Sequence, residues 1–236
     1  MRKLMFITIV CAFLAVPSMA GLTVKTTNGY GIWQTGQGGE FTLLPGGWNP
    51  LPYYVGSTKD QGTMGTFQTF CVEHLEYVYP WTTFDVVLND KAVMGGTAGG
   101  DPLSIGTAWL YHDFQKETLA GYDYTAAGRN ASAAALQNTI WWLEGEAGDP
   151  GAGNIFRQAV IAKFTAAGAM ADNDGAYDVA VLNLWVVGKV GDYTMDASGN
   201  YLYLRQDMLV CTPVPAAVLL GMLGLSVAGL KLRKFA

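Results

Sequence analysis

The spacing of apolar residues changes twice along the chain, and this limits the folds that the chain can adopt. Alternation of apolar and polar residues, which is typical of strands, occurs at 65–78, 82–90, 176–188 and 201–210. Between these stretches, apolar residues recur at helical spacing in 103–122, 130–146 and 155–171. We therefore expect one α+β domain over 21–211, a β-sandwich or barrel with a helical insertion around 102–172.

The composition narrows the class of protein further. Of the 236 residues, 50% are apolar and 14% charged, and the formal net charge is -5. Such a chain has no basic surface to hold nucleic acid, so we expect no nucleic-acid partner. Thirty glycines and the abundance of tyrosine and tryptophan are typical of an exported β-rich protein.

The first twenty residues have the features of a secretory signal peptide. Arg2 and Lys3 precede an apolar run from Leu4 to Val16, which ends in a proline and the small-residue pattern before Gly21. Charge, apolar run and cleavage pattern predict removal of 1–20 on export. The run is short for a membrane anchor.

The last 25 residues, 212–236, predict a membrane segment. An apolar stretch predicts a transmembrane helix over about 214–230, and basic residues after it would keep the end of the chain in the cytoplasm. The mature domain would then face outward. A simple C-terminal anchor is one interpretation of this segment. The residues that define it are Pro213, Val214, Pro215, Lys231, Arg233 and Lys234.

The order of these features resembles the PEP-CTERM sorting signals of Gram-negative bacteria that make exopolysaccharide. Val214 stands where the usual core has an acidic residue. The resemblance implies an exosortase-type sorting enzyme as a partner and an intermediate anchored in the inner membrane. Release to the cell surface or the extracellular matrix would follow, with exopolysaccharide as a neighbour.

Two cysteines remain in the mature chain, Cys71 and Cys211. An oxidising compartment makes a disulfide between them one hypothesis. The other joins Cys71 to Gln137 in an internal thioester, which forms only if folding holds thiol and amide together and excludes water. Apolar neighbours in both segments favour the second hypothesis: Phe70, Val72, Ile140, Trp141 and Trp142. Gln137 is expected to point in the same direction as Ile140 and Trp141.

The motifs "FCVE" and "LQNTIWWL" together resemble the thioester domains of bacterial surface adhesins. That family pairs a cysteine strand motif with a glutamine helix motif of the "TQxA" type. Matched residue by residue, Cys71 takes the place of the thioester cysteine and Gln137 that of the glutamine, while Leu136 and Thr139 differ from many members. The resemblance implies a β-fold with a helical insertion and single-use covalent adhesion to a partner nucleophile such as an amine, without turnover as an enzyme.

Other interpretations stay open at this point. Cys71 can be an inert buried thiol, and Gln137 can serve only hydrogen bonding within its helix. The protein would then be a non-covalent structural or polysaccharide-binding matrix protein, with aromatic side chains stacking on sugars. The aromatic residues considered for this role are Trp33, Trp48, Tyr53 and Tyr54.

The two histidines, His74 and His112, lie near acidic residues but do not have the spacing of metal ligands. We therefore expect no metal, and no motif indicates another cofactor or an enzymatic site. His74 is also a candidate base for acyl chemistry. Strand alternation would, however, place it on the opposite face from Cys71.

Overall fold

The structure is a computed structural model, and it describes residues 23–26, 33–35, 38–46, 66–79, 81–93 and 100–212. Strands and helices occur together in these ranges, which confirms the α+β class. The strands are β1 (Thr23–Thr26), β2 (Trp33–Thr35), β3 (Gly38–Gly46), β4 (Phe67–Thr69), β5 (Thr83–Asn89), β6 (Lys91–Ala92), β7 (Asp101–Pro102), β8 (Val179–Val186) and β9 (Leu204–Cys211). The helices are α1 (Ile105–Gln115), α2 (Arg129–Leu143), α3 (Ile155–Phe164) and α4 (Ala166–Ala169).

The predicted signal peptide and the predicted transmembrane helix lie outside the described residues, as does the sorting motif at 213–215 with its basic tail. Among the helices within the described ranges, none is both long enough and apolar enough to cross a membrane.

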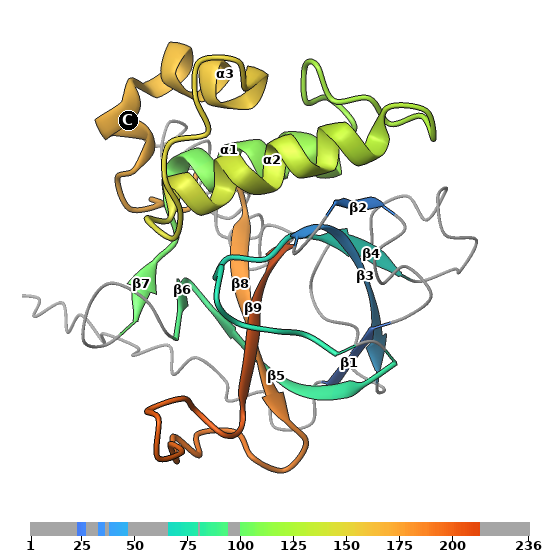
Figure 1. The fold of residues 1–236 in the computed structure, drawn as a ribbon, viewed down its shortest axis with the longest axis vertical. Coiled ribbons are helices and arrows are strands. Elements are labelled where there is room, and N and C mark those ends of the chain that lie inside the picture. Colours follow the sequence, from blue (N-terminus) through green and yellow to red (C-terminus); the bar gives the residue numbers. More distant parts are fainter. Residues whose placement is uncertain are drawn as a thin grey trace, which may run out of the picture.

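The main sheet is antiparallel, and β9, at one end of its strand order, is hydrogen-bonded to the chain that follows β4. Its order is β2-β3-β1-β5-β8-β9, with β4 paired to β3. The chain that follows β4 turns toward β9. The Val72 N–H donates to the Asp207 carbonyl (2.9 Å), and the Leu209 N–H donates to the Phe70 carbonyl (3.2 Å). These bonds connect β9 with the β3–β4 pair, and the sheet curves accordingly in Figure 1.

The four helices of the described ranges lie between β7 and β8 in the chain and form a layer on one side of the curved sheet (Figure 1). The starts of α1 and α3 are stabilised by side-chain caps. The Ser104 hydroxyl accepts a hydrogen bond from the Thr107 N–H at the start of α1, and the Asn154 side chain accepts from the Phe156 N–H at the start of α3.

The prediction of a single helix over 155–171 is wrong. Thr165 has a φ of 65°, which ends α3, and its hydroxyl then accepts a hydrogen bond from the Gly168 N–H to begin the short α4. A β-branched residue rarely adopts this backbone conformation. Apolar spacing continued through the break because both helices bury side chains against the same core: Phe156, Val160 and Ala169.

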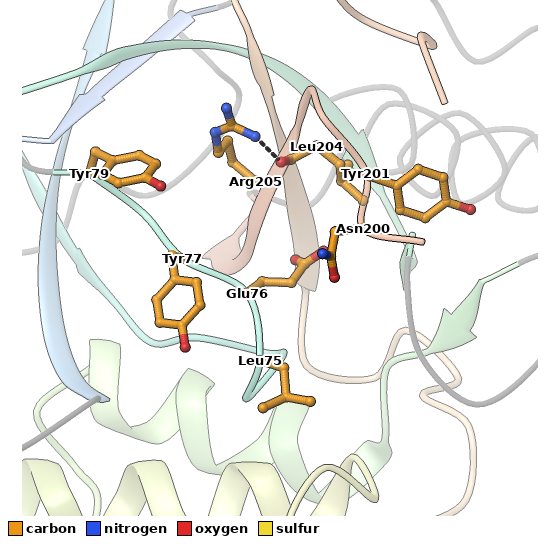
Figure 2. A pocket seen from close by; sticks show the side chains of 8 residues that line it. All are labelled: Leu75, Glu76, Tyr77, Tyr79, Asn200, Tyr201, Leu204 and Arg205. Atoms are coloured by element: carbon orange, nitrogen blue, oxygen red, sulfur yellow. Dashed lines mark hydrogen bonds between the residues drawn. The ribbon is translucent and has the colours of Figure 1, made fainter. Parts of the chain in front are cut away.

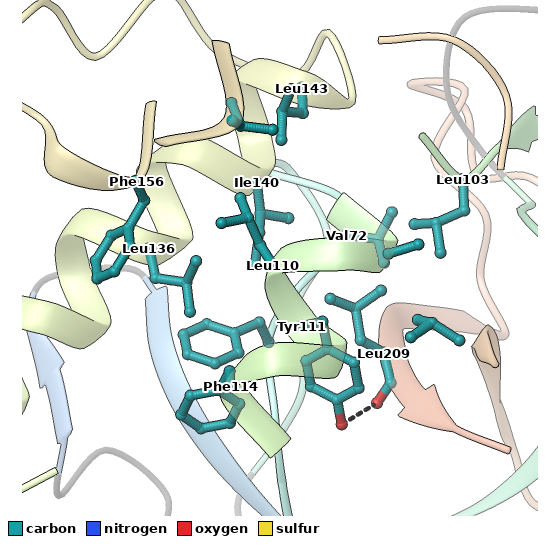
Figure 3. Packing of buried hydrophobic residues seen from close by; sticks show 14 of the residues in the cluster. Val72, Leu103, Leu110, Tyr111, Phe114, Leu136, Ile140, Leu143, Phe156 and Leu209 are labelled. Atoms are coloured by element: carbon teal, nitrogen blue, oxygen red, sulfur yellow. Dashed lines mark hydrogen bonds between the residues drawn. The ribbon is translucent and has the colours of Figure 1, made fainter. Parts of the chain in front are cut away.

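The apolar core has two parts, one on each face of β9. Leu209 and Cys211 face the helices, where Figure 3 shows the aliphatic and aromatic side chains of α1, α2 and α3 packed together. Met208 and Val210 belong to the second cluster, with Phe84 of β5 and Leu182 of β8. Because alternate side chains of a strand point to opposite faces, β9 is buried on both sides.

A buried ion pair joins the start of α2 to β3. The Arg129 guanidinium donates from Nε to Glu40 Oε1 (2.7 Å) and from Nη2 to Glu40 Oε2 (2.8 Å). The Tyr122 hydroxyl also donates to Glu40. Since breaking a buried pair of this kind costs about 3–5 kcal/mol, it fixes α2 against the sheet. The same helix carries Gln137 two turns later.

Candidate functional site

Cys71 lies just after β4, where the chain passes from the β3 side of the sheet to β9. It forms a β-bridge with Met208, and its side chain is 3% exposed. Burial raises the pKa of the Cys71 thiol well above its usual range, and the negative charge of Glu76 raises it further. At neutral pH the residue is therefore a protonated thiol, shielded from solvent.

Gln137 of α2 directs its side-chain amide at the backbone of Cys71. Its Oε1 accepts the Cys71 N–H (3.1 Å), and its Nε2 donates to the Cys71 carbonyl (2.8 Å). Oε1 also accepts the Gly39 N–H of β3 (3.4 Å). The amide thus pairs with Cys71 as a neighbouring strand's peptide group would. Gln137 is 1% exposed, so the predicted pair meets in a site closed to water.

Gly38, at the start of β3, lets the backbone approach this amide closely. A Cβ at that position would lie 2.5 Å from Trp141 Cη2 and 2.6 Å from Gln137 Cγ. Real Cβ atoms do not approach carbon this closely, so any larger residue would push β3 away from α2. Only glycine fits here, and sequence reasoning missed it because the contact joins segments far apart in the chain.

The predicted apolar surroundings divide between the two clusters. Trp141, one turn after Gln137, packs in the same cluster as Cys71. The other predicted neighbours belong to the cluster between helices and sheet: Phe70, Val72, Ile140 and Trp142. The expectation that Ile140 shares the direction of Gln137 and Trp141 is therefore wrong. Residues four apart are more nearly aligned on a helix than residues three apart.

Four carboxyl groups gather beside the site: Glu73, Glu76, Glu146 and Asp207. Burial and then the charges of Glu146, Glu76 and Asp207 raise the pKa of Glu73 to about 10. Burial and the charge of Asp207 raise the pKa of Glu76 to about 9. Both carboxyls hold their protons at neutral pH. The pattern E-x-x-E after Cys71 is visible in the sequence, but Glu146 and Asp207 come from distant segments.

His74 lies on the same side of the sheet as Cys71's cluster, contrary to the expectation from strand alternation. Its ring meets Trp141 edge to face with centroids 4.5 Å apart, and its backbone N–H donates to Glu146 Oε2 (3.2 Å). The reason is that the backbone bends at Val72 and again at 74–75, so β-type alternation does not continue past Cys71.

The structure does not link Cys71 to Cys211. Both thiols are free, and Cys211 lies in the cluster between helices and sheet while Cys71 lies in the other one. Within the described ranges, no three His, Cys, Asp or Glu side chains gather as metal ligands would. His112 instead pairs with Asp113 (2.9 Å) at the surface of α1.

Of the four aromatic residues considered for sugar stacking, only Trp33 lies in the described part of the chain. Its ring packs against the core cluster, with the Arg129 guanidinium 5.5 Å from its centroid. Trp33 is therefore partly buried and packs within the domain. Trp48, Tyr53 and Tyr54 lie outside the described residues.

No family model matches the chain, and neither a curated protein nor a solved structure shows significant similarity to it.

Proposed function

We propose that this protein is an exported surface protein whose domain forms an internal thioester between the Cys71 sulfur and the Gln137 side-chain carbonyl carbon. One observation carries the proposal: the Gln137 amide is hydrogen-bonded to both backbone groups of Cys71 in a water-excluded site. An amide is a poor electrophile, and holding thiol and amide together is the condition under which the two react.

Thioester formation joins the sulfur to the carbonyl carbon and breaks the carbon–nitrogen bond of the amide. The amide nitrogen leaves as ammonia and takes the thiol proton with it. Oε1 stays on the carbon, where the N–H groups of Cys71 and Gly39 donate to it. Donors in this position stabilise the negative charge that develops on the oxygen during attack.

Adhesion reverses the roles of the two residues. An amine on a partner attacks the Gln137 carbonyl carbon, Cys71 leaves as the thiolate and is reprotonated, and a stable amide joins partner to protein. Each molecule reacts once, so the protein is not an enzyme. It needs no metal or cofactor for this step.

The location follows from the two chain ends. A signal peptide over 1–20 directs export, and the segment 212–236 anchors the protein in the inner membrane through a helix over about 214–230. An exosortase-type enzyme then acts at Pro213–Pro215, and the protein reaches the cell surface or matrix. There the domain, a barrel closed through β4 and β9 with a helical insertion, carries the buried thioester.

Intact-mass measurement of the exported full chain tests the thioester. We compare the unsubstituted protein with Cys71→Ala and Gln137→Ala. Each variant should be lighter than the unsubstituted protein by less than the substitution alone predicts, and the shortfall should equal one ammonia, because only the unsubstituted protein has lost it. Incubation with methylamine should then add one methylamine to the unsubstituted protein and none to either variant.

Cys211→Ala is the matched control, since it removes the other buried thiol and should leave the missing ammonia unchanged. Masses that equal the plain sequences in all four proteins would rule the thioester out. Gln137 would then act only as a structural partner of the Cys71 backbone.

A further inference from the structure

A separate cavity of about 360 Å³ opens at the surface, and its wall begins a few residues after Cys71. Figure 2 shows that it lies between the segment after β4 and the loop that leads into β9. Three of its side chains are largely exposed: Leu75 (76%), Tyr77 (60%) and Tyr79 (56%). Glu76 and Arg205 also line the cavity.

The walls of this cavity are held by hydrogen bonds to regular structure. On one side, the Gln206 side chain donates to the Glu73 carbonyl (2.7 Å), and the Asp207 N–H donates to Glu76 Oε2 (3.2 Å). On the other side, Asp196 accepts from the Asn200 N–H (2.9 Å) within a tight loop. A ligand would therefore enter a preformed site, and little conformational entropy would be lost in ordering loops around it.

Arg205 gives the cavity a positive charge. Its Nη1 donates to the carbonyls of Leu202 (3.0 Å) and Leu204 (2.6 Å), and its guanidinium lies 5.8 Å from the Tyr79 ring centroid. In the part of the chain that the structure describes, Nε and Nη2 of Arg205 have no acceptor and the residue makes no ion pair. Glu76 turns its Oε2 toward the backbone of β9.

Size and chemistry together indicate the class of ligand. The volume is near the lower end for small-molecule sites. Exposed tyrosine rings present electron-rich faces, which suit the C–H face of a sugar. A guanidinium with uncommitted N–H groups suits a carboxylate.

We propose that this cavity binds an acidic sugar unit of a polysaccharide, with tyrosine rings against the sugar and Arg205 on its carboxylate. Binding here is non-covalent and does not require the Cys71–Gln137 thioester. The site would bring the protein to an acidic polysaccharide whether or not a covalent bond follows.

The test measures binding of the full-length chain to alginate, a polyuronate, and to dextran, a neutral glucan, by affinity electrophoresis. We expect retardation in alginate and little in dextran. Arg205→Gln and Tyr77→Ala should each weaken alginate binding at least about tenfold, because each loses an interaction of about 1.4 kcal/mol or more. Higher salt should weaken binding of the unsubstituted chain.

Trp81→Ala is the matched control, since Trp81 is an equally exposed aromatic residue (61%) that does not line the cavity. It should bind alginate as the unsubstituted chain does. Melting temperatures check that each variant is folded, and Cys71→Ala should bind normally. Absence of alginate binding, equal binding of dextran, or normal binding by Arg205→Gln would overturn the proposal.

Discussion

Replacing Gln137 by alanine tests whether its amide holds the site together before any covalent bond forms. The change is made in a Cys71→Ala background, where no thioester can form and the backbone at position 71 is kept. Alanine removes the acceptor of one buried N–H and the donor to one buried carbonyl at position 71. It also removes a longer bond from the Gly39 N–H.

The expected magnitude follows from these lost partners. An unsatisfied buried polar group costs about 1–3 kcal/mol, so two such groups at roughly 1.5 kcal/mol each lower the free energy of unfolding by about 3 kcal/mol. For a domain of this size, about 1 kcal/mol shifts the melting temperature by about 2–4 °C. We therefore expect the double variant to melt about 6–12 °C below Cys71→Ala.

Urea unfolding followed by tryptophan fluorescence, together with thermal melting, provides the measurement. Asn138→Ala in the same background is the control, because Asn138 is the exposed neighbour on α2 and its loss should change stability by less than about 0.5 kcal/mol. If Gln137→Ala costs no more than Asn138→Ala, the amide does not hold the Cys71 backbone and the reasoning is wrong.

Two further predictions concern the packing and the charges around the site. Gly38→Ala should lower the free energy of unfolding by about 1–3 kcal/mol because its Cβ would overlap Trp141. Gly153→Ala, which meets nothing within 4 Å, should be neutral in the same urea assay, and equal effects of the two would contradict the overlap. The second prediction concerns pH. The pKa of Glu73 is about 10 in the folded state, above its ordinary value of 4.5, so between these two pH values the folded state binds more protons than the unfolded state. The free energy of unfolding therefore falls as pH rises, by up to about 1.4 kcal/mol per pH unit. The melting temperature should fall from pH 5 to pH 8 and fall less in Glu73→Gln; an unchanged slope in that variant would show that Glu73 is not the group responsible.

Local patterns in the sequence were enough to predict most of the regular elements. The alternating segments at 82–90, 176–188 and 201–210 overlap β5, β8 and β9, and the three segments at helical spacing overlap the four helices of the described ranges, with bounds that differ by one residue for β9 and α2. This works because burial of one face imposes a period that depends only on the geometry of the element itself. The break at Thr165 was missed because apolar spacing carries no information on a single backbone angle.

The candidate site was predicted in part. Cys71 and Gln137 were chosen for their chemistry, and the structure brings the amide of one to the backbone of the other. The role of Gly38, the carboxyls of Glu146 and Asp207, and the surface cavity were not predicted. Each of them depends on segments that meet only after the sheet has curved.

By itself, the sequence determined the types of element and their order, and it indicated Cys71 and Gln137 as candidates. The tertiary structure decided which of these residues meet. The physical reason is that periodicity describes the faces of one strand or helix, whereas the contact between Gln137 and Cys71 depends on how α2 is fixed against β3 and how β4 joins β9. Those contacts are set by packing and buried hydrogen bonds between distant segments, which no local pattern records.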